Sequence, residues 1–192
     1  MVITISSSHI SKSEQTNTNE LLQQKNVLYF IKKIMNLKKL SAKVLICTLT
    51  CLVLGIASGI GTASSVETWF PSIIKPSWNP PSWLFGPVWT MLYILMGIAI
   101  ALIWHTPHPK QKTAIRLFIF QFCLNLAWSF IFFTQHQIGW AFVEITCIWI
   151  ALIFTIFAFS AVNKNAAYLL LPYICWVSFA AILNGTIWYL NR

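Results

Sequence analysis

The side chains that most often carry out catalysis are scarce in this chain of 192 residues. Its four acidic residues are widely spaced, at Glu14, Glu20, Glu67 and Glu144. The sequence contains no Ser/His/Asp arrangement, no paired carboxylates and no glycine-rich phosphate loop. Hydrolysis and phosphoryl transfer therefore lack the groups that they require.

Metal binding is not predicted either. All five cysteines lie within apolar segments, and neither a CxxC pair nor a Cys/His spacing suited to zinc occurs. His105, His108 and His136 lie in predicted loops, and no second ligand residue accompanies any of them. We expect reduced helical cysteines, solvated loop histidines and no bound metal.

The aromatic residues carry more information, and they gather with proline in one segment. Residues 75–90 have the sequence KPSWNPPSWLFGPVWT. The prolines favour a stiff, extended backbone, and the tryptophans suit the headgroup level of a membrane. We therefore expect a rigid flap over the outer mouth of a helix bundle, which we call the connector cap: Lys75, Pro76, Trp78, Pro80 and Pro81.

The elements that must position these side chains are helices in a lipid bilayer. Hydrophobic residues make up 57% of the chain and charged residues only 9%, against about a quarter charged in soluble domains. The apolar runs are continuous rather than alternating, which excludes a β-barrel. The net charge of +9 comes from basic residues that flank these runs, so it indicates topology and contact with lipid headgroups rather than nucleic-acid binding.

Hydropathy predicts five helical spans, because about 20 apolar residues cross the hydrocarbon layer. A proline-rich connector, residues 67–82, joins the first two. The predicted fold class is an all-α integral membrane protein with a five-transmembrane-helix bundle. The spans are residues 44–66, 83–104, 113–134, 138–161 and 166–190.

The distribution of lysine and arginine predicts the orientation of the bundle. Of the 13 basic residues, only Lys75 and Arg192 fall on the side of the connector. The positive-inside rule therefore places the N-terminus inside and the connector and C-terminus outside. The arginine-poor composition favours a bacterial envelope membrane over an organelle membrane.

Residues 1–42 form an N-terminal extension to the membrane domain of residues 43–192. Residues 1–20 are polar and aperiodic, which predicts disorder. Residues 27–40 alternate apolar side chains at helical spacing with lysines, a pattern typical of a basic amphipathic helix on an anionic membrane surface. A second interpretation takes Met35 as the true start, so that residues 1–34 are not translated.

The motif of residues 75–97 resembles the signature of the TspO/MBR translocator proteins, the tryptophan-rich sensory proteins and peripheral benzodiazepine receptors. The resemblance extends through Gln121, Asn125 and Trp128 in the third span, and through Pro172-Tyr173 and Trp176 in the fifth. It covers about residues 44–190. One departure is Phe70, where the family usually has a tyrosine that follows Trp69.

The resemblance implies a five-helix bundle, often a homodimer, with a pocket toward the connector. It implies binding of porphyrins such as protoporphyrin IX and haem, of sterols in some lineages, and no required cofactor. The second, third and fifth predicted spans each contribute two positions that match the family motif. The two positions are three or four residues apart, so they share one helix face. The implied pocket residues are Trp89, Tyr93, Asn125, Trp128, Trp176 and Ala180.

The leading functional hypothesis is a membrane protein that senses, sequesters or moves tetrapyrroles. An alternative is an enzyme that degrades porphyrin in light, with Trp89 or Trp176 as the candidate catalytic residue. A conventional alternating-access transporter is disfavoured, because the chain shows no internal duplication or pair of broken helices.

Three further features are weaker. Glu144 lies at membrane depth and is a functional candidate for that reason. The Gly55-x-x-x-Gly59 motif predicts close helix packing, either within one bundle or between protomers. Leu183, Tyr189 and Arg192 fit a sterol-recognition pattern.

Overall fold

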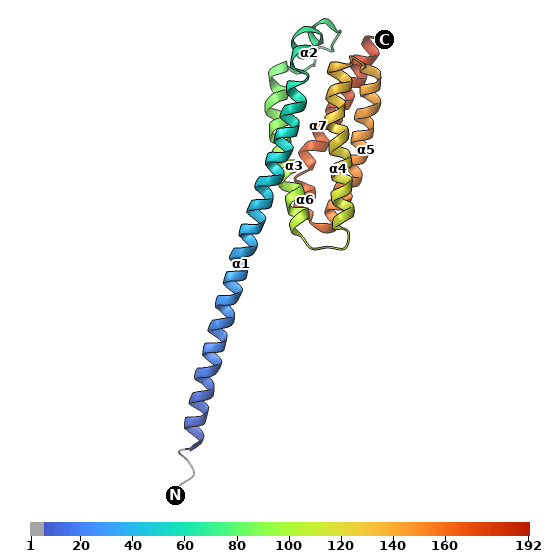
Figure 1. The fold of residues 1–192 in the computed structure, drawn as a ribbon. Coiled ribbons are helices and arrows are strands. Elements are labelled where there is room, and N and C mark those ends of the chain that lie inside the picture. Colours follow the sequence, from blue (N-terminus) through green and yellow to red (C-terminus); the bar gives the residue numbers. More distant parts are fainter. Residues whose placement is uncertain (1–5) are drawn as a thin grey trace. The chain divides into compact units, whose positions relative to one another are not determined.

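The structure of the chain, a computed structural model, describes the backbone of residues 6–192 and the side chains of residues 17, 18 and 22–192. The chain divides into two units, Met1–Ser41 and Ala42–Arg192. Within the described residues every regular element is a helix (Figure 1). This confirms the predicted all-α fold class.

The first unit contains the start of helix α1 (Ser6–Ile60). The prediction of disorder for residues 1–20 was wrong from Ser6 onward, whereas residues 1–5 lie outside the described residues. Polar residues can extend an existing helix because propagation adds one backbone hydrogen bond for each residue fixed. From Leu22 to Lys39 the side chains are exposed.

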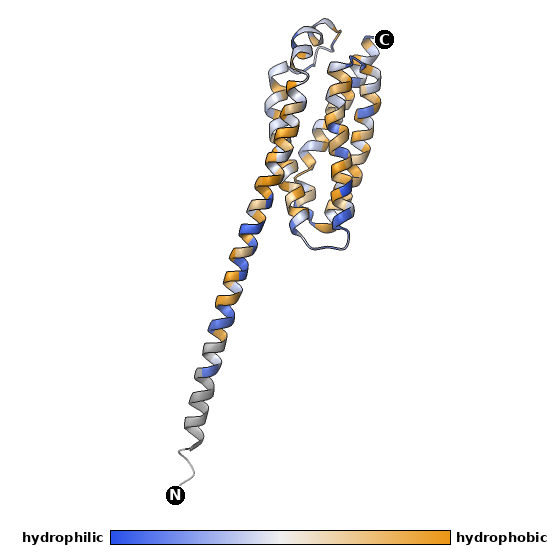
Figure 2. Ribbon diagram, in the orientation of Figure 1, coloured by the Kyte–Doolittle hydropathy of each residue, from blue (hydrophilic) through white to orange (hydrophobic). Residues whose placement is uncertain are grey.

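Five helical segments are long and apolar enough to cross a membrane, as the sequence predicted. Figure 2 shows hydrophobic residues along most of the length of α3, α4, α5 and α7. The chain is therefore an integral, multi-pass membrane protein. The segments are Leu22–Ile60, Ser82–His105, Gln111–Thr134, Ile138–Val162 and Lys164–Leu190.

Within the second unit, α5 (Ile138–Val162) packs most extensively against α4 (Gln111–Ser129) and α7 (Leu171–Leu190). Helix α3 (Phe85–His105) packs against α4 and the short α6 (Lys164–Tyr168). The large side chains between these helices are fully buried, with Met96, Phe159 and Tyr173 at most 2% exposed.

Two spans are less regular than predicted. The third ends in a π-helical turn, η3 (Phe130–Thr134), in which the Gln135 amide donates to the Phe130 carbonyl. The fifth consists of two helices, α6 and α7, and Pro172 stands in the first turn of α7, where its missing N–H costs no helical bond. Among the described residues this is the one span that is divided into two helices.

Less of the segment between the first two spans is non-helical than the sequence predicted. The first span ends at Ile60 rather than Val66, and a separate helix α2 (Ala63–Thr68) follows. The 3₁₀ turns η1 (Phe70–Ser72) and η2 (Ser82–Leu84) flank an extended, proline-rich segment. Glycine at position 61 lies between α1 and α2, where the chain changes direction.

Contacts between the loops define the two ends of the second unit. At one end, the Lys43 ammonium donates to the Trp104 carbonyl over 2.9 Å, and the Asn163 amide donates to the Thr106 hydroxyl over 3.2 Å. At the other end, Ile74 and Asn191 exchange two hydrogen bonds of 2.9 and 2.8 Å. The connector and the C-terminus therefore share one end of the bundle, as the predicted topology requires.

Candidate ligand-binding cavity

A cavity of about 480 Å³ opens among the connector and helices α1, α3, α4, α5 and α7. This volume lies within the range of about 300–1,000 Å³ that is usual for small-molecule sites. All six pocket positions implied by the family resemblance contribute to its lining, and the lining residues carry no formal charge. These six are Trp89, Tyr93, Asn125, Trp128, Trp176 and Ala180.

One wall of the cavity is built by consecutive turns of α3. The Trp89 and Tyr93 rings stack with centroids 5.5 Å apart, and Trp89 also meets Tyr173 of α7 edge to face at 6.2 Å. The Tyr93 hydroxyl donates to Asn125 Oδ1 over 3.2 Å, which ties α3 to α4. Since Tyr93 and Asn125 are both buried, this bond holds the wall in one conformation.

The two remaining tryptophans of the cavity differ in their hydrogen bonding. Trp128 Nε1 donates to the Ala141 carbonyl and to Asn184 Oδ1, both at 3.1 Å, so its ring is fixed by α5 and α7. Trp176 Nε1 is buried and has no partner among the described residues. Trp128 is thus held in one orientation, whereas the Trp176 indole retains an unpaired donor.

A second polar pair lies in the same core. The Tyr173 hydroxyl donates to Gln121 Oε1 over 3.1 Å, and both residues are fully buried. Gln121 Nε2 is also without a partner among the described residues. The sequence placed these residues in the family motif but assigned them no role in the pocket.

Lys75 joins the connector cap to the turn that precedes it in the chain. Its ammonium donates to the carbonyls of Phe70, Ile73 and Pro71 at 2.7, 2.8 and 3.2 Å, and it lies 5.0 Å from the centre of the Phe70 ring. Phe70 lines the cavity. Lys75 therefore fixes the turn that carries one of the cavity's aromatic side chains.

The rest of the connector cap contacts α7 rather than the cavity. Trp78 packs edge to face on Phe179 at 5.9 Å, and Phe179 in turn contacts Trp176 at 5.6 Å. Pro76, Pro80 and Pro81 do not line the cavity, and neither do Lys75 and Trp78. The cap thus contacts the lining of the cavity through Phe70 directly, and through Phe179 in the case of Trp176.

The substitution of phenylalanine for the family's tyrosine at position 70 has a visible consequence. The Phe70 ring is buried against Phe132 and Phe133, with centroids 6.2 and 5.8 Å away. Phe132 and Phe133 belong to the π-helical turn η3. The Phe70 ring thus packs the connector on η3 and lies 5.0 Å from the Lys75 ammonium.

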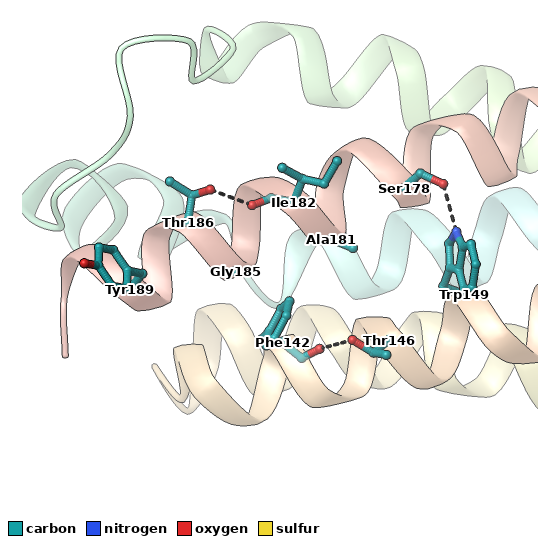
Figure 3. Close-up of a pocket in the computed structure, with 9 residues that line it drawn as sticks. All are labelled: Phe142, Thr146, Trp149, Ser178, Ala181, Ile182, Gly185, Thr186 and Tyr189. Carbon is teal, nitrogen blue, oxygen red and sulfur yellow. Dashed lines mark hydrogen bonds between the residues drawn. The ribbon is translucent and has the colours of Figure 1, made fainter.

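A second hollow, of about 620 Å³, lies on the face between α5 and α7 (Figure 3). Phe142 and Gly185 form its floor, and Trp149 Nε1 donates to the Ser178 hydroxyl over 2.8 Å at one end. Tyr189 lines the other end, and the Arg192 guanidinium lies 4.4 Å from the centre of its ring. None of the six implied pocket residues lines this hollow.

The structure does not bring the three residues of the sterol-recognition pattern together. Leu183 is buried against Phe132 and Ala141, whereas Tyr189 is exposed. The two residues are six apart on α7, which places them on different faces of a helix of 3.6 residues per turn. Tyr189 and Arg192 alone remain adjacent.

The remaining candidates lie away from the cavity. Glu144 is partly exposed on α5 and lines neither hollow. His136 has a left-handed backbone (φ 55°), is exposed as predicted, and stacks on Trp69 with ring centres 4.2 Å apart. No cluster of metal ligands occurs among the residues that the structure describes.

Sequence reasoning missed the part of the cavity that α1 supplies. Gly55 and Gly59 both line it, and a Cβ at Gly55 would overlap the Tyr93 ring. Gly55 therefore serves packing within one bundle, whereas Gly59 borders the cavity with no atom within 4 Å of its Cβ position. The motif itself signalled close approach, but only the register of α1 on α3 identifies Tyr93 as its neighbour.

The fold and the cavity define a class: a helical membrane protein with an aromatic, uncharged cavity at the connector end of its bundle. A sequence model of the TspO/MBR family matches residues 47–190. The chain belongs to this family.

Individual relatives are similar to this chain over most of their own length. The tryptophan-rich protein TspO of Chlorobaculum tepidum is 43% identical over 148 residues, which cover 76% of this chain and 94% of the relative. The TspO of Archaeoglobus fulgidus is 39% identical over 82% of this chain and 99% of its own. The human translocator protein is 39% identical over 65% of this chain and 75% of its own. The prokaryotic relatives agree with the expected bacterial membrane.

Proposed function

We propose that this protein binds tetrapyrroles such as protoporphyrin IX and haem in the aromatic cavity, and that it senses, sequesters or moves them. The observation that carries the proposal is the Trp176 indole N–H, which is buried without a partner at a cavity walled by Trp89 and Trp128. A planar macrocycle suits flat aromatic walls. Its ring nitrogens or carboxylates supply the acceptor that the indole lacks.

A titration of the purified protein with protoporphyrin IX, followed by quenching of tryptophan fluorescence, tests binding. Saturable quenching at micromolar ligand is expected, and its absence would remove the proposal. Filling the cavity should abolish saturation. Gly59→Phe does this without a clash at the Cβ, which has no atom within 4 Å.

Gly61→Phe is the matched control. Gly61 lies two residues away and does not line the cavity, and a Cβ there makes only ordinary contacts of 3.7 Å. This variant should bind as the unmodified protein does. Equal quenching curves for the two variants would place the porphyrin elsewhere, for example in the groove between α5 and α7.

A sterol is a second candidate ligand, and competition with protoporphyrin IX for the same quenching signal distinguishes the two. We also propose a homodimer, as the family resemblance implies. Cross-linking of the protein in membranes tests this assembly.

Light-driven degradation of porphyrin is a second candidate function. It is favoured by the position of Trp89, whose ring lines the cavity beside Tyr93 and Tyr173 and would donate an electron to an excited macrocycle, with dissolved dioxygen as the oxidant. Illumination of the protein with protoporphyrin IX should then bleach the porphyrin. Trp89→Phe and Trp176→Phe should stop bleaching at ligand concentrations that saturate each variant. Bleaching that is indifferent to both substitutions would exclude the enzymatic role.

A further inference from the structure

We propose that residues 22–41 of α1, which precede its uncharged membrane-crossing stretch of residues 44–60, bind an anionic lipid surface through one apolar face, and so act as a basic amphipathic anchor. These residues precede the family match of residues 47–190, and none of them lines the cavity. The inference therefore concerns a separate part of the molecule from the proposed ligand site.

The apolar face is exposed, and one lysine, Lys38, lies on it at the heptad position of Ile31. Val27 and Ile34 are seven residues apart, as are Phe30 and Leu37, so the four side chains form one stripe along the helix. Val27 and Phe30 are 58% and 62% exposed, and Ile31 extends the stripe. Figure 2 shows hydrophobic and hydrophilic residues alternating along the N-terminal half of α1.

A line of cations runs along the opposite face. Lys25, Lys32 and Lys39 recur every seven residues, half a turn from the stripe. No acidic residue occurs between Glu20 and Glu67 to offset them. An apolar stripe with lysines on the other face is the composition that settles at the boundary between anionic headgroups and acyl chains.

A second copy of the chain is the less suitable occupant of the stripe. In heptad terms the stripe covers two repeats, whereas stable coiled coils need about three or four. In a parallel pair, Lys33 at position g would oppose Lys38 at position e of the other helix, and like charges at these positions repel. An anionic lipid surface attracts the same lysines.

Limited proteolysis of the full-length protein tests the anchor, because trypsin cleaves after these lysines. The protein is placed in nanodiscs of phosphatidylcholine alone or of phosphatidylcholine with phosphatidylglycerol. Cleavage between Lys25 and Lys39 is measured by mass spectrometry relative to cleavage after Lys12, which precedes the stripe. We expect the anionic lipid to slow this cleavage about tenfold and 0.5 M salt to restore much of it.

Two double variants keep every lysine and separate the stripe from general effects. Phe30→Ser with Ile34→Ser removes the stripe and should abolish the protection by anionic lipid. Tyr29→Ser with Leu40→Ser removes two apolar side chains off the stripe and should leave the protection intact. Equal rates in the two lipids would overturn the proposal, as would equal loss in both variants. Protection that persists in neutral detergent and rises with protein concentration would assign the stripe to a second copy.

Discussion

At the scale of single residues, hydrogen bonding distinguishes two tryptophans that line the cavity, Trp128 and Trp176. The sequence treats Trp128 and Trp176 alike, since each shares a helix face with a second pocket position. The structure gives Trp128 two acceptors and leaves Trp176 with none. Substitution should therefore affect the two positions in opposite ways.

Trp128→Phe should lower the free energy of unfolding by about 1–3 kcal/mol, because Asn184 Oδ1 and the Ala141 carbonyl lose a buried donor. Trp176→Phe removes an unpaired donor and should leave stability unchanged or slightly raised, while weakening the binding of protoporphyrin IX. Thermal unfolding in detergent and fluorescence titration measure the two effects. A destabilised Trp176→Phe protein would show that the indole N–H has a partner in solution.

The two glycines of the GxxxG motif also make different predictions. Gly55→Ala places a methyl group against the Tyr93 ring, which Asn125 holds in place, and should cost about 1–3 kcal/mol of stability. Gly59→Ala adds a methyl group in open space and should stabilise the helix by about 0.4–1 kcal/mol. The midpoints of thermal unfolding compare them directly. If the motif instead joined two protomers, Gly59→Ala would weaken the dimer in cross-linking.

At the scale of elements, the connector is an ordered structure that rests on one lysine. Lys75 gathers three carbonyls of a turn that carries Phe70 into the cavity. Phe70 in turn packs on the π-helical turn that ends the third span. The connector and the π-helical turn η3 thus pack against each other beside the cavity.

Lys75→Met should loosen this connector while leaving the helices intact. The carbonyls of Phe70, Pro71 and Ile73 lose a charged donor, and we expect amide hydrogen exchange in residues 69–75 to become at least about tenfold faster. Lys164→Met serves as the control, since the structure gives that side chain no hydrogen bond. Unchanged exchange in the Lys75 variant would show that the Trp78 and Asn191 contacts hold the connector by themselves.

At the scale of the whole molecule, the ends of the bundle are distinguished by charge. Lys43, Lys110 and Lys164 gather at the end where Trp104 and Thr106 meet their partners, whereas the connector and C-terminus share the other end. The positive-inside rule then predicts that the cavity's connector end faces the outside.

Cysteine labelling in intact cells checks this orientation. A membrane-impermeant maleimide should label Arg192→Cys in intact cells and Lys164→Cys only after the cells are opened. The unmodified chain, with its five free cysteines, supplies the background. The reverse pattern would invert the topology and place the connector inside.

The sequence determined the membrane class, the number of spans and the family motif, because long uncharged runs and fixed residue spacings are local properties of the chain. Through the family motif it also identified six positions that line the cavity, five of them aromatic or polar and one an alanine. Only the tertiary structure decided what each of them does there. Whether an indole N–H finds an acceptor depends on oxygen atoms from other helices. For Trp128 these are the Ala141 carbonyl and Asn184 Oδ1.

The same reason explains what local patterns did not predict. The break between α6 and α7, the π-helical turn and the pairing of Gly55 with Tyr93 all depend on the register of one helix against another. Register follows from packing that involves residues far apart in the chain. Segment types and membrane spans were thus set locally, whereas the shape of the cavity and the free donor within it were set by how the helices meet.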